Sequence, residues 1–115
     1  SLPSFNAGMQ GLKGSPDEGG LRVPFFVRGD GRWPAGRDVD RIAGDIDIFP
    51  TLAELAAAEM PQGQVEGRSL LPLLQDPSAT WSDRCLFTHV GRWPTGASPD
   101  DFKMKNFSLR TQRFR

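Results

Sequence analysis

The segment GLKGSPDEGGLRVPFFVRG, at residues 11–29, decides how this chain is expected to fold. Its first half is rich in Gly, Ser and Pro and has neither a helical nor a strand period, which is typical of a loop. Its second half holds a short apolar run bounded by glycines, which predicts a buried strand at about residues 23–28. Pro24 cannot donate a ladder hydrogen bond, so it must lie at the start of this strand or on an edge. We therefore expect a long loop over residues 1–20 that leads into a strand.

A helix is predicted further along, in DIDIFPTLAELAAAEM at residues 45–60. Asp47 is placed to cap this helix, and its first turn tolerates Pro50 because the first amides have no intrahelical acceptor. The spacing predicts a helix over about residues 48–59, with one apolar stripe made of Ile48, Leu52, Leu55 and Ala56.

The rest of the chain predicts one short helix and two strands. Ser69 is placed to cap a helical turn over residues 70–74, and Pro77 stops it. CLFTHV at residues 85–90 and NFSLRTQRF at residues 106–114 contain β-branched and aromatic residues in partial alternation, as strands do. Two late strands without a helix between them predict a small antiparallel sheet.

Composition and charge exclude some classes of partner. The chain has 14 Lys and Arg against 14 Asp and Glu, so no net field attracts nucleic acid. The basic tail at residues 102–115 is explained more simply by a strand with cationic outer positions than by an RNA-binding surface. No apolar run approaches the roughly 20 residues of a membrane span. Cys85 is the only cysteine, and we interpret it as a small buried apolar side chain.

Lys13 is the residue most suggestive of chemistry. It stands between Gly11 and Gly14, and glycines permit the close backbone approach that ligand-binding loops need. A lone lysine in such a loop is more often simply solvated. The residues alone leave both interpretations open.

Several segments resemble the sulfatase family, in the family's order. GLKGSPDEGGLRVPFFVRG resembles Gly-x-Lys-Gly-(Ser/Thr) followed by Glu-Gly-Gly-x-Arg-Val-Pro and a hydrophobic strand. DIDIFPTLAELA, at residues 45–56, is similar to the Asp-(Ile/Leu)-(Phe/Ala)-Pro-Thr-Leu helix, and EGRSLLPLL, at residues 66–74, to Asp-Gly-x-Ser-Leu-Leu-Pro-Leu-Leu. FNAGMQGLKGS at residues 5–15 and CLFTHVGRW at residues 85–93 resemble arylsulfatase-like enzymes. The resemblance therefore covers nearly the whole chain.

The resemblance implies an α/β fold, namely the C-terminal part of an alkaline-phosphatase-like sulfatase fold that ends in a small antiparallel sheet subdomain. Residues 1–75 would be the end of the catalytic domain, and residues 76–115 part of the C-terminal subdomain. The chain stops at Arg115 inside a strand pattern, so we expect a fragment of a longer protein. Without its parent sheet, the strand near residues 23–28 should expose apolar side chains.

The resemblance also implies a chemistry. In such enzymes a formylglycine made from Cys or Ser attacks sulfur, while a calcium ion, lysines, histidines and an arginine hold the sulfate. Lys13 matches the later of the family's sulfate-contacting lysines and is the predicted catalytic residue. Cys85 lacks the Cys/Ser-x-Pro/Ala-x-Arg context of the formylglycine site. We predict no metal ligands in this chain, calcium bound elsewhere in the full-length parent, and no activity for the chain alone.

The implied function is that of a sulfuric ester hydrolase that cleaves sulfate esters of carbohydrates or aryl alcohols. A typical bacterial parent would be periplasmic or secreted. Two alternatives stay open: a phosphodiesterase or phosphonate hydrolase of the same superfamily, and a non-catalytic carbohydrate-binding relative. The nucleophile and metal-binding motifs upstream of this chain would separate them.

Three further polar residues are candidates near the site. We interpret Glu18 as an anchor for the loop, with Arg22 as the most obvious partner, in preference to a general base. His89, the only histidine, and Arg92 are predicted substrate-binding residues, because C-terminal loops often rim the cleft in this family. For His89 the plainer alternative is a partly buried ring at a strand end, hydrogen-bonded to backbone.

Overall fold

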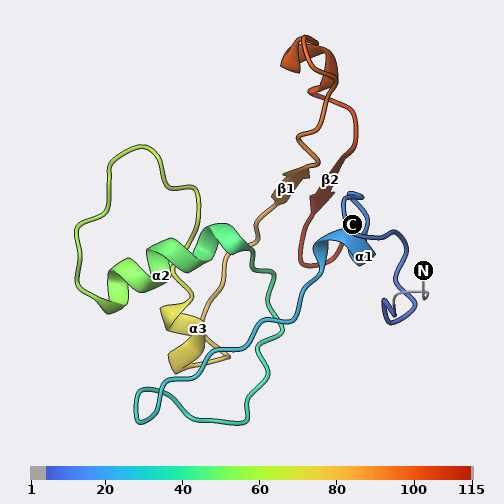
Figure 1. The fold of residues 1–115 in the computed structure, drawn as a ribbon. Helices are drawn as coiled ribbons and strands as arrows, with labels where there is room; N and C mark the ends of the chain where they lie inside the picture. The colour runs from blue at the N-terminus through green and yellow to red at the C-terminus, as the bar shows by residue number, and fades with distance from the viewer. Residues whose placement is uncertain (1–4, 115) are drawn as a thin grey trace. The chain divides into compact units, whose positions relative to one another are not determined.

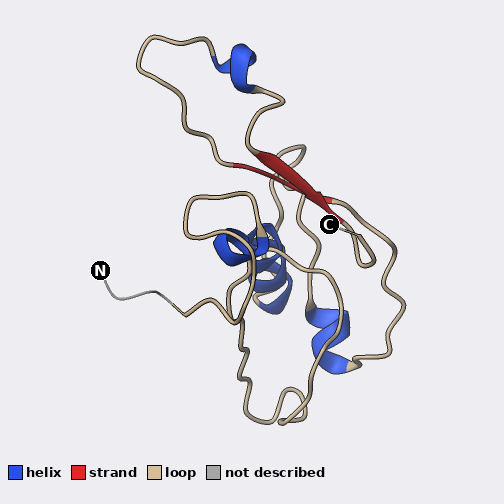
Figure 2. Ribbon diagram, turned by 90° about the vertical axis from the view of Figure 1, so that its right-hand side faces the viewer, coloured by secondary structure: helices blue, strands red, loops and turns tan. Residues whose placement is uncertain are grey.

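Most of the chain is loop, and short helices and strands fix it at a few points (Figure 2). The computed structural model describes residues 5–114, so residues 1–4 of the predicted loop and Arg115 lie outside the described residues. The described part forms two compact units. The hairpin unit comprises the residues up to 25 together with those from 87 onward, and the helical unit comprises residues 26–86.

The hairpin unit contains a two-stranded antiparallel sheet, as predicted (Figure 1). Its strands are β1, Leu86–His89, and β2, Phe107–Arg110. The rings of Phe87 and Phe107 stack across the strands with centroids 5.2 Å apart, the kind of aromatic pair that stabilises a hairpin. β2 is shorter than predicted because the chain turns at Thr111, whose amide donates to the carbonyl of Phe114 at 2.8 Å.

Two short helices complete the hairpin unit. The helix α1, Glu18–Leu21, lies in the segment that precedes the predicted strand. The 3-10 helix η2, Pro99–Phe102, lies in the loop that joins β1 to β2.

The strand predicted near residues 23–28 is wrong, because these residues form no strand. A strand satisfies its backbone amides and carbonyls by pairing with a neighbour. The sheet of the described residues contains β1 and β2 alone, and this segment pairs with neither of them. The predicted exposure of its apolar side chains is confirmed, since Val23, Phe25, Phe26 and Val27 are all exposed.

The helical unit is built on the 3-10 helix η1, Asp45–Asp47, and the helix α2, Ile48–Leu55. α2 begins where predicted but ends four residues early. Ala57 adopts a positive φ of 50°, and the amide of Ala58 donates to the carbonyl of Ala53 at 2.9 Å. This is a Schellman ending, which stops the helix before the predicted residue 59.

The buried face of α2 is not its most apolar stripe. Leu52, in the middle of the predicted stripe, is 58% exposed, whereas Thr51 and Ala53 are buried. The reason is the helix α3, Leu71–Gln75, which packs against α2 together with the residues just before it. Among the described residues, the small core consists of Ala53, Leu70 and Leu73.

α3 ends just before Pro77, as predicted, but Ser69 is not the N-cap residue that the sequence predicted. The hydroxyl of Ser69 accepts from the amide of Leu71 at 3.2 Å, although Leu70 holds the cap position itself. α3 ends at Gln75, and the next residue, Asp76, adopts the extended conformation that a following Pro77 favours. None of the helices in the described residues is long and apolar enough to span a membrane.

Candidate functional site

Lys13 occupies the second position of a tight turn in the hairpin unit. The amide of Ser15 donates to the carbonyl of Leu12 at 2.9 Å, which closes the turn. Gly14, at the third position, has a φ of 92°, as a type II turn requires and as glycine adopts readily. The side chain of Lys13 is exposed at this turn.

The glycines of the Glu-Gly-Gly segment allow α1 to pack directly against the turn. A Cβ on Gly19 would lie 2.2 Å from the carbonyl oxygen of Gly11, and one on Gly20 would lie 2.2 Å from that of Ser15. Both clashes are with backbone, which cannot rotate away as a side chain can. The amide of Gly19 also donates to the carbonyl of Gln10 at 2.8 Å. Glycine is therefore needed at both positions to hold the Lys13 turn.

Glu18 anchors this loop, as predicted, but the arginine closest to it is not the expected one. Arg110 on β2 donates Nη2 to Oε1 of Glu18 at 2.5 Å, whereas the nearest nitrogen of Arg22 is 3.8 Å away. The side chains of Glu18 and Arg110 are 11% and 24% exposed. The loop that carries Lys13 is thus attached to the sheet by a largely buried ion pair.

A cavity of about 250 Å³ lies beside this ion pair. Its lining includes Glu18, Arg110 and Ser108, and the buried hydroxyl of Ser108 has no hydrogen-bond partner among the described residues. The cavity belongs to the hairpin unit alone.

His89 has the geometry of the plainer interpretation, a partly buried ring at a strand end that is hydrogen-bonded to backbone. It is the half-buried last residue of β1, its Nε2 lies 2.8 Å from the carbonyl of Phe102, and its Nδ1 accepts from the amide of Gly91 at 2.8 Å. The second bond requires an unprotonated Nδ1, so the neutral ring donates from Nε2. Both ring nitrogens are therefore engaged with backbone, while Arg92 nearby is exposed.

The hairpin separates His89 from the anchor of Lys13. The amide of Val90 donates to the carbonyl of Asn106, so the end of β1 lies beside the start of β2. The two strands run in opposite directions (Figure 1), so Arg110, the last residue of β2, lies at the other end of the sheet. At about 3.3 Å per residue, the two ends of a four-residue strand are roughly 10 Å apart. The structure therefore does not bring His89 to the end of the sheet where Arg110 bonds Glu18.

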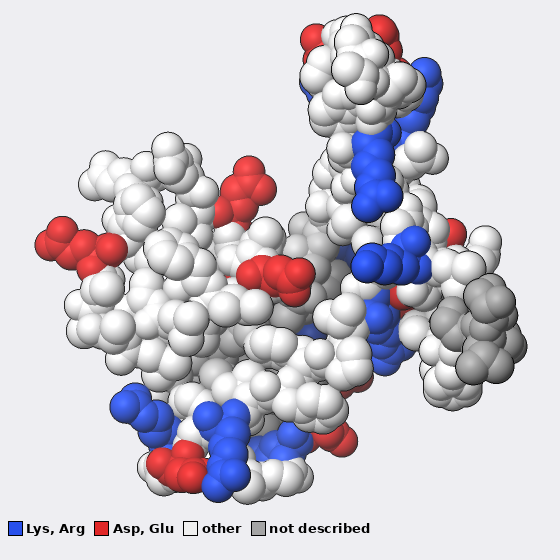
Figure 3. Space-filling model, viewed as in Figure 1, with Lys and Arg blue, Asp and Glu red and all other residues white. Residues whose placement is uncertain are grey.

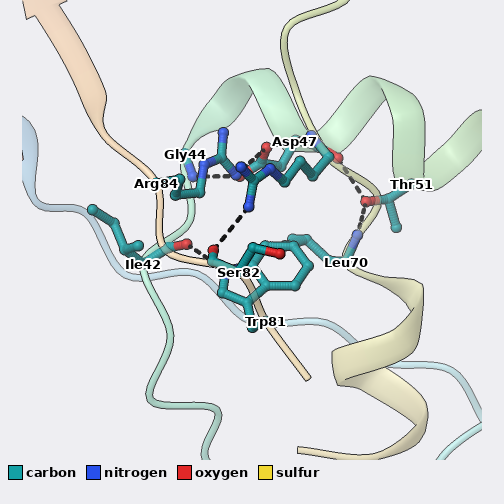
Figure 4. A network of polar contacts seen from close by, with 9 residues as sticks. Ile42, Gly44, Asp47, Thr51, Leu70, Trp81, Ser82 and Arg84 are labelled. Carbon is teal, nitrogen blue, oxygen red and sulfur yellow. Dashed lines mark hydrogen bonds and ion pairs between the residues drawn. The ribbon is translucent and has the colours of Figure 1, made fainter. Parts of the chain in front are cut away.

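The helical unit contains a buried polar network centred on Asp47 (Figure 4). Both carboxylate oxygens accept from Nη1 of Arg84, at 2.7 and 2.8 Å. The amides of Gly44 and Arg68 donate to the same carboxylate at 2.9 and 2.8 Å. Asp47 does hold the predicted cap position of α2, but its side chain makes no cap hydrogen bond there. The predicted capping role is wrong, because arginine and more distant amides occupy the carboxylate.

This network joins two of the sequence motifs. The hydroxyl of Thr51 donates to the carbonyl of Asp47 at 2.6 Å and accepts from the amide of Leu70 at 2.8 Å. A Cβ on Gly67 would lie 1.9 Å from the carbonyl oxygen of Ile46, so only glycine fits there. The segments at residues 45–56 and 66–74 therefore form one packed unit.

Two further observations bear on the predicted chemistry. Cys85 is exposed, so the prediction of a buried apolar side chain is wrong. Residues 5–114 contain no group of three or more His, Cys, Asp or Glu side chains that could hold a metal ion. On the face seen in Figure 3, positive and negative side chains are interspersed with uncharged ones.

Residues 16–115 match the family described as "N-sulphoglucosamine sulphohydrolase, C-terminal". The chain belongs to this family. Membership of the sulphohydrolase C-terminal family confirms the resemblance to sulfatases. Lys13 itself precedes the matched residues.

The relatives of this sulphohydrolase family member are named as sulfatases. Human arylsulfatase D is 39% identical over 93 residues, which cover 79% of this chain and 16% of the relative. Human steryl-sulfatase is 40% identical over 89 residues, covering 73% and 15%, and the Clostridium perfringens arylsulfatase is 39% identical over 74 residues, covering 62% and 15%. The chain thus spans about a sixth of the length of these relatives. No solved structure matches it significantly.

Proposed function

We propose that the whole protein is a sulfatase that hydrolyses sulfate esters of carbohydrates or aryl alcohols. Family membership and relatives named arylsulfatase and steryl-sulfatase support this activity. In the same proposal, residues 1–75 end an alkaline-phosphatase-like α/β domain, and residues 76–115 begin its antiparallel C-terminal subdomain. No relative named here is a phosphodiesterase or a carbohydrate-binding protein, which favours the sulfatase over both alternatives.

We propose that Lys13 binds the sulfate group of the substrate. The observation that carries this role is the placement of an exposed ammonium group on a turn whose backbone is fixed by α1 and the sheet. As the S–O bond of a sulfate ester breaks, negative charge gathers on the bridging oxygen, and a fixed cation stabilises it. In a site that the rest of the protein closes to water, at ~4 Å and an effective dielectric constant near 20, the attraction is about 4 kcal/mol, roughly a thousandfold in rate if it acts only in the transition state.

The remaining chemistry would come from other parts of the protein. The described residues offer no cluster suited to calcium, and Cys85 lacks the formylglycine context. Within this chain, Arg92 is the exposed candidate for contacting the substrate beyond its sulfate, and His89 would hold the start of the loop that carries Arg92.

The proposal is tested with the purified full-length protein and three chromogenic substrates, an aryl sulfate, an aryl phosphodiester and an aryl phosphonate. We expect turnover of the aryl sulfate to exceed that of both phosphorus esters. Preferred turnover of the phosphodiester or phosphonate would replace the sulfatase with the superfamily alternative. Binding of a sulfated sugar without turnover of any substrate would favour the non-catalytic relative.

A further inference from the structure

We propose that Arg110 is a positioning residue for Lys13 and acts through Glu18. The inference rests on the proposed sulfatase function and deepens it, because it assigns a role to a residue 97 positions beyond the lysine. Arg110 itself touches no reacting atom in this proposal. It sets where the backbone of the Lys13 turn lies.

First, the sheet gives Arg110 a rigid position from which to hold Glu18. Arg110 ends β2, which is paired with β1, and the ring of Phe107 on β2 stacks on that of Phe87 on β1. Its guanidinium bonds Glu18, 92 residues away in sequence, with both side chains largely removed from solvent. A short hydrogen-bonded ion pair in such surroundings is screened less than an exposed one. The sheet therefore fixes the first residue of α1.

The second step is the transmission from α1 to the turn. Gly19 follows Glu18 directly and bonds the carbonyl of Gln10 through its amide. A Cβ on Gly20 would lie 2.7 Å from the carbonyl oxygen of Leu12, the residue before Lys13. Backbone lies against backbone at both points, so a shift of Glu18 displaces the atoms on both sides of the turn. Close-packed contacts transmit such shifts because they leave no void to absorb them.

Arg22 provides a matched control within the same unit. It carries the same guanidinium and faces the same carboxylate oxygen, but at 3.8 Å and with its side chain 66% exposed. Such exposed pairs at i,i+4 contribute little. If net charge near Glu18 were all that mattered, removing either arginine would have a similar effect.

The experiment compares Arg110→Met, Arg110→Lys and Arg22→Met in the full-length enzyme, each with and without Lys13→Ala, using an aryl sulfate. We expect Arg110→Met to lower kcat/KM by at least ~10-fold, Arg110→Lys to restore part of the loss, and Arg22→Met to stay within about twofold of wild type. In the Lys13→Ala background, Arg110→Met should have little further effect, since residues that act as one unit are non-additive. Amide exchange at Gly19 should accelerate in Arg110→Met but not in the control Arg22→Met.

Each contrary outcome has a separate meaning. A loss in Arg110→Met that multiplies with that of Lys13→Ala would show a general folding defect and overturn the positioning role. Wild-type kcat/KM in Arg110→Met, with activity lost in Lys13→Ala, would overturn it while leaving the proposed function intact. Wild-type activity in Lys13→Ala would remove the role of Lys13 itself. If Arg110→Met does not fold, Arg110→Lys and Glu18→Gln carry the same comparison, and wild-type kcat/KM in both would overturn the inference.

Discussion

Each unit contains an ion pair between arginine and carboxylate, and the two pairs differ in burial. In the helical unit, the side chains of Asp47 and Arg84 are 0% and 5% exposed, and two backbone amides share the carboxylate. In the hairpin unit, Glu18 and Arg110 retain partial access to water. Removing one partner of a fully buried pair leaves an unpaired charge in the protein interior. When the pair is less deeply buried, water can reach the remaining charge. The same chemistry thus stabilises the fold in one unit and, in our proposal, places a loop in the other.

The largest expected effect comes from the buried pair. Asp47→Ala leaves the guanidinium of Arg84 buried without its carboxylate and removes the acceptor of two amides. We expect a loss of about 3 to 5 kcal/mol in the free energy of unfolding. Chemical unfolding of the full-length protein, followed at a probe on α2, measures it.

The control for this prediction is an exposed pair in the same unit. Arg28 donates Nε to Asp30 at 2.8 Å, but both side chains are largely exposed. Asp30→Ala should leave the unfolding transition unchanged. Equal losses in the two variants would mean that burial does not separate these pairs.

The less deeply buried pair, Glu18 and Arg110, should have an intermediate effect on stability. Glu18→Ala removes a hydrogen bond between charged groups whose partners can then be hydrated. We expect a loss of about 1 kcal/mol, smaller than that of Asp47→Ala, measured by the same unfolding experiment at a probe on the hairpin. A loss as large as that of Asp47→Ala would make Glu18 mainly a stabilising residue and weaken the contrast between the units.

The smallest effect concerns an exposed carboxylate that has a serine partner in place of a close arginine. The hydroxyl and amide of Ser78 both donate to Oδ1 of Asp76, at 2.6 and 2.9 Å, and these bonds lower the pKa of Asp76 below its ordinary value. A lowered pKa in the folded state stabilises the fold above the unfolded pKa, and this contribution is lost as the pH falls through the folded value. An NMR titration should show the lowered pKa in the wild type and its return toward the ordinary value in Ser78→Ala. An unchanged pKa in Ser78→Ala would exclude the serine hydroxyl as the main cause, because the alanine variant keeps the backbone amide.

Local patterns predicted the elements whose signals lie within a few residues. The two late strands have alternating aromatic and β-branched residues, and Pro77 marks the end of α3. The sequence did not predict where α2 ends. Ala57 adopts a positive φ there, and alanine is not a residue type that indicates a positive φ. The strand predicted near residues 23–28 does not form, because strand formation depends on a pairing partner that no local pattern reveals.

The sequence indicated the loop at Lys13 and its anchor Glu18, but not the partner of that anchor, and the role of Lys13 stays a prediction. Gly11, Gly14 and the Glu-Gly-Gly segment indicated a shaped loop at Lys13, and the contacts of Gly19 and Gly20 explain why those residues are glycines. Arg110 could not be inferred for Glu18, because a contact across 92 residues is set by the tertiary fold. Strand alternation does place Arg110 on the same face as Ser108, which gave a face for its side chain but no partner.

The most direct test of the proposed function measures kcat/KM of Lys13→Ala in the full-length protein on an aryl sulfate, together with the melting temperature. Loss of a positioned charge should cost about 2 to 4 kcal/mol of transition-state stabilisation, or roughly 30- to 1000-fold in rate. The exposed turn position should keep the stability change within about 0.5 kcal/mol. Lys13→Arg should be nearly as damaging, because a planar guanidinium does not reproduce a compact ammonium. Turnover by Lys13→Ala within about twofold of wild type would instead make Lys13 a solvated loop residue and contradict its proposed role.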